Sequence, residues 1–219
     1  MQFKIQNKNN WLLFIVMIIN GGIYSQSIEK LYVQMPDILN PTLSSQNRLE
    51  LLEYHKAHQS DSTTNRFGNM AYLMLLDTVN QHLIVKNTES STFEMKLNRL
   101  ADSSLCIGII RTACAPVCQS TIEFYDTAWN VIPLRFVPPK ASEWLIEKKT
   151  DTEQIDDNWL HKSLDISFVS MTFSNENNII MLKNNTLDFL SVADQKILKP
   201  LISDKIFRYK LKNSSWLPE

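Results

Sequence analysis

A succession of short segments with the period of a β-strand, joined by short connectors, constrains this chain more than any other feature of its sequence. In T-F-E-M-K-L at 92–97, apolar and polar side chains alternate. The connectors at 77–80 and 87–91 join antiparallel neighbours, because a parallel crossover needs about a dozen residues or more. We expect strands at Tyr72–Leu76, His82–Lys86, Thr92–Leu97, Leu105–Thr112, Thr121–Tyr125 and Val131–Val137.

The side-chain patterns of two of these strands indicate different surroundings. The segment 92–97 has its apolar side chains on one side, so we expect the other side, with Thr92, Glu94 and Lys96, to face water. The stretch L-C-I-G-I-I at 105–110 is apolar at both parities, which indicates a central strand covered on both faces, with the first helix on one of them. Within it, Gly108 indicates close packing of a helix or a bulge rather than a ligand contact.

Helical patterns occur before and after the meander. Ser44–His58 predicts a helix whose first serines can accept hydrogen bonds from the free amides of the first turn, and the polar stretch Gln59–Asn65 predicts a loop. Beyond Pro138-Pro139 and a charged segment we expect a strand at Leu164–Phe173, a turn at Asn175–Asn178, a strand at Ile179–Lys183, a helix at Ser191–Leu201 and a strand at Lys205–Leu211. The predicted class is α+β: an antiparallel β meander packed with one or two helices, plus a smaller C-terminal β-hairpin, helix and strand unit.

The first 25 residues have the pattern of a signal peptide. Lys4 and Lys8 precede an uncharged apolar run, Trp11–Ile19, which is shorter than the about 20 residues of a membrane span, and Ser25 suits cleavage before Gln26. The alternative, a buried N-terminal helix, is disfavoured because the run does not alternate apolar with polar positions. We therefore expect a periplasmic or secreted protein, without a lipid anchor because no cysteine follows the cleavage point.

The expected organisation is a signal peptide at 1–25, a helix plus antiparallel β unit at 26–137, a linker at 138–162 and a smaller unit at 163–219 that is either separate or continuous with the first. Cleavage leaves 194 residues with 20 basic and 23 acidic side chains. No run of Lys and Arg occurs, which argues against a nucleic-acid or anionic-membrane partner. No second apolar stretch is long enough to span a membrane, so we expect no stable membrane insertion.

Two of the three cysteines lie in T-A-C-A-P-V-C-Q-S at 112–120. Cys114 ends one predicted strand and Cys118 begins the next, so a three-residue connection places them across a hairpin, where a disulfide can form in an oxidising compartment. The loop it closes is small, and the chain-entropy contribution is only about 2 kcal/mol. We favour a structural disulfide.

The alternative is a redox-active pair. Such pairs usually have two intervening residues and lie at a helix N-terminus, whereas Cys114 and Cys118 have three and lie between strands. Cys106 lies eight residues before Cys114, about 26 Å along an extended strand, which is too far for pairing. We expect Cys106 to be free and buried.

Several short motifs together resemble a family of exported proteins of unknown function from anaerobic Gram-negative bacteria. They are M-P-D at 35–37, N-R-L at 47–49, N-R-F-G at 65–68, S-S-T-F-E-M-K-L at 90–97, C-A-P-V-C at 114–118 and I-E-F-Y at 122–125, with L-S-V-A-D-Q-K-I-L-K-P-L at 190–201. The resemblance implies a periplasmic or secreted location. It supplies no catalytic residue.

Other candidates for chemistry are weak. His55 and His58 could share a metal, but no further ligands are spaced nearby, so we expect no metal site and no cofactor. His82 and His161 are isolated, and we expect both to be solvated. The carboxylates of Asp156 and Asp157 lie in a hydrophilic stretch, where they should be ionised. No G-x-S-x-G, H-E-x-x-H, P-loop or dinucleotide signature occurs.

The sequence therefore leaves three functional hypotheses. The favoured one is a non-catalytic binding or interaction module of the cell envelope, whose sheet surface or edge strand recognises another envelope protein or a ligand. The second is a thiol-dependent accessory factor that uses Cys114 and Cys118. The third is a hydrolase whose site is assembled from distant residues.

Overall fold

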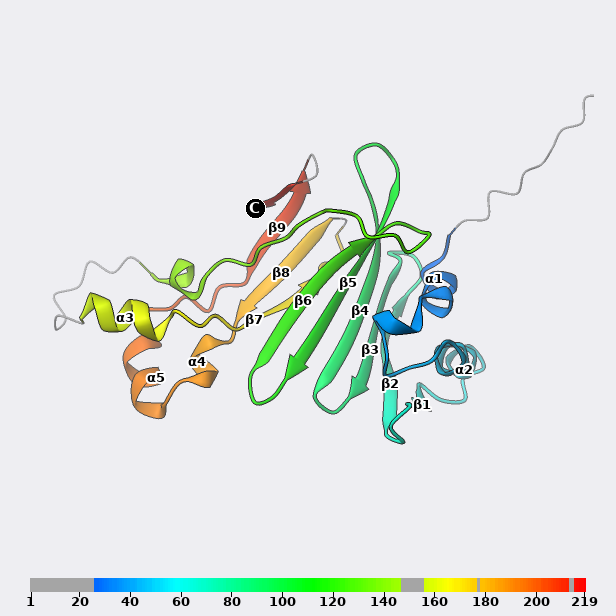
Figure 1. Ribbon diagram of the computed structural model, residues 1–219, viewed down its shortest axis with the longest axis horizontal. Helices are drawn as coiled ribbons and strands as arrows, with labels where there is room; N and C mark the ends of the chain where they lie inside the picture. Colours follow the sequence, from blue (N-terminus) through cyan, green and yellow to red (C-terminus); the bar gives the residue numbers. More distant parts are fainter. Residues whose placement is uncertain (1–25, 147–155, 177, 213–214) are drawn as a thin grey trace, which may run out of the picture.

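The computed structural model describes residues 26–146 and 156–219 apart from 177, 213 and 214. In these residues the chain forms two antiparallel sheets accompanied by short helices, which confirms the predicted α+β class (Figure 1). The first sheet has the strand order β1-β2-β3-β4-β5-β6, and the second has the order β10-β9-β8-β7. The predicted signal peptide and part of the predicted linker lie outside the described residues, and the domain boundaries stay predictions.

The elements of the first part of the chain are α1 (Ile28–Gln34), α2 (Ser45–Lys56), β1 (Ser62–Thr64), β2 (Met70–Asp77), β3 (His82–Thr88), β4 (Ser91–Arg99), β5 (Leu105–Cys114) and β6 (Cys118–Tyr125). Those of the second part are α3 (Asp157–Ser163), β7 (Val169–Phe173), β8 (Ile179–Asn184), α4 (Thr186–Phe189), α5 (Val192–Leu198), β9 (Phe207–Lys212) and β10 (Ser215–Pro218). Single 3-10 turns occupy Asp37–Leu39 and Ala141–Trp144.

The meander matches the sequence prediction from β2 to β6 and departs from it afterwards. The predicted strand Val131–Val137 is wrong: Val131 makes only an isolated bridge to Tyr125. Pro133 and the pair Pro138-Pro139 have no N–H to donate to a ladder, so the segment cannot continue the sheet. It crosses the second part of the chain instead and buries Leu134 and Phe136 there.

Five short elements have no counterpart in the sequence prediction. β1 lies within the predicted loop Gln59–Asn65, and α3 begins in the predicted linker. The others are α1, α4 and β10. None exceeds seven residues. An element this short shows too few periods of hydrophobicity to be recognised from its own sequence.

One face of the first sheet is covered by α1 and α2 (Figure 1). The hydroxyl of Ser27 accepts from the N–H of Lys30 and begins α1, and Ser44 and Asn47 form a capping box that begins α2. The core between helices and sheet contains Ile28, Leu31, Tyr32, Leu51, Leu52, Leu83, Val85, Phe93, Met95, Ile107 and Ile109. Ile107 and Ile109 place one side of β5 in this core, as expected, but the predicted helix, α2, lies against β1 and β2, and α1 lies against β3 and β4.

The opposite face of the first sheet is not exposed to water over β4, so that prediction is wrong. Glu94 is 6% exposed and Lys96 is fully buried, because β7 lies across them. The ammonium group of Lys96 donates to the carbonyl of Ser174 and, at 2.8 Å, to that of Glu176. Burial lowers the pKa of Lys96, and the carboxylate of Glu94 opposes this shift.

β7 packs against the first sheet with its edge. Its N–H groups at 169, 171 and 173 point away from β8 and need acceptors. Side chains of the first sheet supply them: Gln119 Oε1 at 2.7 Å from Val169 N, Ser120 Oγ at 2.9 Å from Met171 N, and Glu94 Oε1 at 2.7 Å from Phe173 N. The open edge of the second sheet is thus closed by side chains of the first.

Gly108 marks a close approach of the two sheets. A Cβ atom at this position would lie 2.5 Å from the ring of Phe173, closer than carbon atoms can approach. The ladder between β4 and β5 runs through Gly108 without a shift of register. The close packing therefore comes from an aromatic ring of β7, and neither a helix nor a bulge is involved.

Gly108→Ala should lower the free energy of unfolding by about 1–3 kcal/mol, because the new methyl group forces Phe173 out of its position. Chemical denaturation measures this loss. In the double variant with Phe173→Leu, the smaller side chain relieves the clash. The loss of stability in the double variant should therefore be smaller than the sum of the losses in the two single variants. Strictly additive losses would contradict the contact.

Glu94→Ala should destabilise the protein by about 3–5 kcal/mol, because it leaves His82, the hydroxyl of Thr172 and the N–H of Phe173 without their buried acceptor. Denaturation together with amide exchange at Phe173 measures the effect. The matched control is Glu89→Ala in the exposed β3–β4 turn, which should change little. Equal losses in both variants would argue against the packing of β7 described above.

Candidate functional site

Three hairpin turns of the first sheet and the loop between α1 and α2 lie at the same end of the molecule (Figure 1). We call this surface the hairpin end: residues 37–42, 65–69, 89–90 and 114–118. Backbone bonds join its parts, from Arg66 N to Thr42 O at 3.0 Å and from Cys114 N to Ser90 O at 2.8 Å. The order of the strands and a few local bonds therefore bring four separate segments together.

Asp37 holds the loop between α1 and α2 in place. Its carboxylate accepts from Ser45 N at 3.0 Å, lies 3.1 Å from Arg48 Nη2 and pairs with Arg66. Three motifs of the family resemblance, at 35–37, 47–49 and 65–68, thus meet at one carboxylate. This contact joins the loop to α2 and to the β1–β2 turn.

Arg48 is fully buried beneath this loop, and the sequence reasoning missed it. Its guanidinium group donates to Leu43 O at 2.6 Å and to Met35 O. Burial lowers the pKa of Arg48, while Tyr32 and Asp37 oppose the shift. An arginine three and four residues before buried leucines, on the apolar stripe of a helix, is the signal that could have revealed it.

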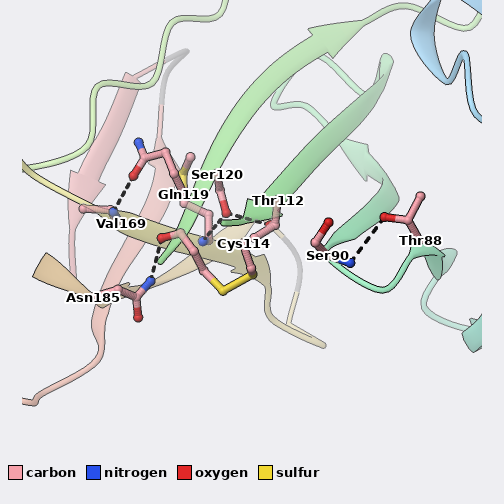
Figure 2. The surroundings of a disulfide bond; sticks show 10 residues. Thr88, Ser90, Thr112, Cys114, Gln119, Ser120, Val169 and Asn185 are labelled. Carbon is pink, nitrogen blue, oxygen red and sulfur yellow. Dashed lines mark hydrogen bonds between the residues drawn. A yellow bond between two sulfur atoms is a disulfide. The ribbon is translucent and has the colours of Figure 1, made fainter. Parts of the chain in front are cut away.

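The disulfide lies at the tip of the β5–β6 hairpin. Cys114 and Cys118 are opposite each other in the ladder, with Cα atoms 3.9 Å apart and sulfur atoms 1.98 Å apart. Figure 2 shows that the same hairpin holds the second sheet: Cys118 O accepts from Asn185 Nδ2 at 3.0 Å, and Gln119 accepts from Val169 N. Both cysteines are at strand ends, and neither is in the first turn of a helix, where redox-active pairs usually lie. This placement is typical of a structural disulfide.

Cys106 lies on β5 and is a free thiol in the core between the two sheets. It is 1% exposed, and burial raises its pKa to about 12 from an ordinary value near 9. A thiol in this state is protonated at neutral pH and does not react as a nucleophile.

A cleft of about 370 Å³ opens on the hairpin end, between the α1–α2 loop and β3 to β6. It is lined by Leu39, Asn40, Pro41, Thr42, Asn87, Ser91, Thr92, Phe93, Arg111, Thr112, Ala113, Gln119 and Thr121. The side-chain amides of Asn40 and Asn87 bond each other, at 3.3 and 3.1 Å, and fix one wall. Apolar walls with a few fixed polar groups are typical of a ligand site.

Arg111 is the charged residue of the cleft. Its Nε donates to Leu39 O at 2.9 Å, and its Nη1 donates to Glu123 Oε2 at 2.7 Å. The hydrogen bonds from Arg111 and Tyr125 hold the pKa of Glu123 below its usual value. The guanidinium group is therefore held in one orientation at the edge of the cleft.

Two large apolar side chains project into solvent beside the cleft. Ile38, next to the lining residue Leu39, is 84% exposed. Phe67 is 70% exposed in a turn in which Asn65 Oδ1 accepts from the N–H groups of residues 67 and 69 and Gly68 takes a φ of 81°. The turn geometry, which favours glycine, thus presents Phe67 outward.

The histidines are separated in the structure. His55 Nδ1 lies 2.6 Å from Asp61 Oδ1 on the surface, and His58 follows the end of α2. His82 was expected to be solvated, which is wrong: it is 2% exposed and lies 2.7 Å from Glu94, because β7 covers it. The side chain of His161 lies outside the described residues. In the described part of the chain no three His, Cys, Asp or Glu residues are grouped as a metal site.

Of the two carboxylates considered in the hydrophilic stretch, Asp156 is exposed and accepts from Asn158 N at 2.9 Å. The side chain of Asp157 lies outside the described residues. In the hydrogen bonds of the described chain, neither His55 nor His82 contacts a hydroxyl or a thiol. These residues form no nucleophile and base pair.

The fold defines a two-sheet α+β protein with a cleft at its hairpin end. The chain belongs to the family DUF3256, described as a protein of unknown function, whose model matches residues 21–215. A comparison with curated proteins gives no match. No helix in the described residues is long and apolar enough to span a membrane.

A solved structure shares the fold. It is titled "Structure of a domain of an uncharacterized protein from Porphyromonas gingivalis W83". The superposition has a TM-score of 0.73 at 18% sequence identity and covers 88% of this chain and 97% of the other. The family of unknown function expected from the motifs is thus confirmed, and the solved structure extends the likeness to the fold.

Native protein treated with a thiol reagent at neutral pH should show no reactive thiol, because Cys106 is buried and protonated and the other two cysteines are joined. Unfolding without reductant should expose one thiol, and unfolding with reductant should expose three. Mass spectrometry of the labelled protein counts them. Labelling of native Cys114 or Cys118 would contradict the structure.

Proposed function

We propose that this protein is an exported, non-catalytic binding module of the cell envelope that recognises a partner or ligand with the hairpin end. The observation that carries the proposal is the arrangement of this surface. A cleft with one fixed cation lies beside two exposed apolar side chains, Ile38 and Phe67. Large apolar side chains around a partly polar depression are typical of binding surfaces.

Three of the four sheet edges, β1, β7 and β10, are poor sites for a further strand, which supports loops as the binding surface. β1 has three residues, and the N–H groups of β7 are accepted by side chains of the first sheet. β10 contains Pro218, which has no N–H to offer a further strand. Strand addition at these edges is therefore less favourable than recognition through the turns.

Export is proposed from the sequence. The basic residues Lys4 and Lys8, the apolar run Trp11–Ile19 and the cleavage point after Ser25 support it, and a disulfide at the hairpin end is compatible with an oxidising compartment. A periplasmic or secreted location follows from this pattern as part of the proposal.

The two alternatives receive less support. A thiol-dependent factor would need a reactive pair, whereas Cys114 and Cys118 join the ends of two paired strands. The helix that begins beside them, α4, has only four residues, and its N-cap Asn185 contacts the backbone carbonyl of Cys118. A hydrolase would need a nucleophile beside a base, and the hydrogen bonds of His55 and His82 go to carboxylates.

The test is affinity capture from an envelope extract in mild detergent, with the chain from Gln26 onward as bait. Ile38→Ser and Phe67→Ser should each reduce capture of a reproducible partner about tenfold or more, because each removes an exposed apolar contact. Val79→Ser is the matched control: Val79 is 88% exposed in the β2–β3 turn at the opposite end of the sheet. Absence of a partner, or equal capture by all three variants, would rule the proposal out.

A further inference from the structure

The charge of the cleft lining indicates which ligands it can hold. Of its lining residues, Arg111 is a cation and none is an acid. The neutral polar residues among them carry hydroxyl and amide groups that can donate hydrogen bonds, and Thr121, which is paired with Arg111 across β5 and β6, makes no side-chain hydrogen bond with the described chain. Leu39, Phe93 and Ala113 add an apolar wall. The lining therefore favours an anionic group attached to an apolar one.

Arg111 retains donors after its internal contacts are made. Its Nε and Nη1 bond Leu39 O and Glu123 Oε2, and the guanidinium group also interacts with the hydroxyl of Tyr125, which leaves further N–H donors for a ligand. A guanidinium group has five N–H donors in a planar fork, which suits a carboxylate. Because the two existing bonds already hold the side chain, a ligand would lose little affinity in ordering it.

The carboxylate of Glu123 bonds Nη1 of this guanidinium group, is half exposed and is not part of the cleft lining. It compensates the charge of Arg111 when the cleft is empty. A carboxylate in the cleft would share the same cation and would be repelled by Glu123. The pair Arg111 and Glu123 thus sets the strength with which the cleft takes an anion.

We propose that the cleft of the hairpin end binds a carboxylate that carries a small apolar group, with Arg111 as its cationic partner and Leu39, Phe93 and Ala113 against the apolar part. The volume of about 370 Å³ is at the lower end of ligand sites, which span roughly 300–1,000 Å³. A short-chain organic acid and the C-terminus of a peptide ending in an apolar residue both present this chemistry. This inference deepens the proposed function and rests on it for the choice of surface.

The test is heteronuclear NMR of the chain from Gln26 onward, titrated with 4-methylpentanoate and with its neutral amide. The acid should shift the backbone amide signals of Asn87, Thr92 and Ala113, with saturation in the millimolar range. The neutral amide of the acid should bind more weakly, by a factor of about ten or more. Acetyl-Gly-Gly-Leu as the free acid and as the C-terminal amide forms the second arm. Tighter binding of the peptide acid than of 4-methylpentanoate indicates a protein C-terminus, and the reverse indicates a small organic acid.

Substitutions test whether Arg111 is the cation that pairs with the ligand carboxylate. Arg111→Met should weaken binding of the acid about tenfold or more, whereas Arg99→Met, which removes an exposed arginine at the opposite end of the sheet, should not. Glu123→Gln should strengthen binding roughly threefold, because it removes the competing charge and leaves an amide oxygen to hold Arg111. A purely structural role of Arg111 predicts no gain in Glu123→Gln, so this variant decides the question even where Arg111→Met does not fold.

The proposal is overturned where the amides bind as well as the acids, where neither acid shifts the cleft signals, or where Glu123→Gln weakens binding. Failure of the acids together with capture that depends on Ile38 and Phe67 means that the ligand class is wrong and the binding module stands. Arg111-dependent binding of an acid without such capture means that the ligand class is right and that the proposed recognition of a partner through Ile38 and Phe67 is wrong.

Discussion

The β7 edge packs against the face of the first sheet, and this contact sets how the two sheets are joined. An edge strand has unpaired N–H groups that must find acceptors when buried. Here Glu94, Gln119 and Ser120 supply them from two different strands. Because each acceptor fits one N–H group, the second sheet has one position on the first, and Gly108 provides the space that this position requires.

This packing leaves the hairpin end as one of the accessible surfaces of the molecule, besides the exposed side chains Met70, Tyr72 and Met74 of β2. The helices cover one face of the first sheet, β7 crosses the other over β4 to β6, and the edge strand β1 has only three residues. The disulfide between Cys114 and Cys118 lies where the β5–β6 hairpin meets the second sheet, with Asn185 bonded to its backbone. The same hairpin that positions the second sheet therefore forms one border of the cleft, which opens between rigid elements.

Local patterns were sufficient for most of the meander and insufficient for its surroundings. The alternation around Phe93 and the doubly apolar stretch at 105–110 predicted strands that the structure contains. The prediction of a strand at Val131–Val137 was wrong, because prolines lack the N–H groups that a ladder needs, and the hydrophobic pattern does not show this. The cleft could not be predicted at all, because Leu39, Asn87 and Arg111 are distant in the sequence and meet only through the strand order.

Most strands, their antiparallel connections and the α+β class could be derived from the sequence, because side-chain periodicity and connector length are local properties. The sequence also indicated a central strand covered on both sides. Only the tertiary structure decided that Glu94, Lys96 and His82 are buried, since the same alternating pattern fits a face exposed to water and a face that meets polar groups of another sheet. Whether a polar face is wet depends on what packs against it, and that partner lies about eighty residues away in the chain.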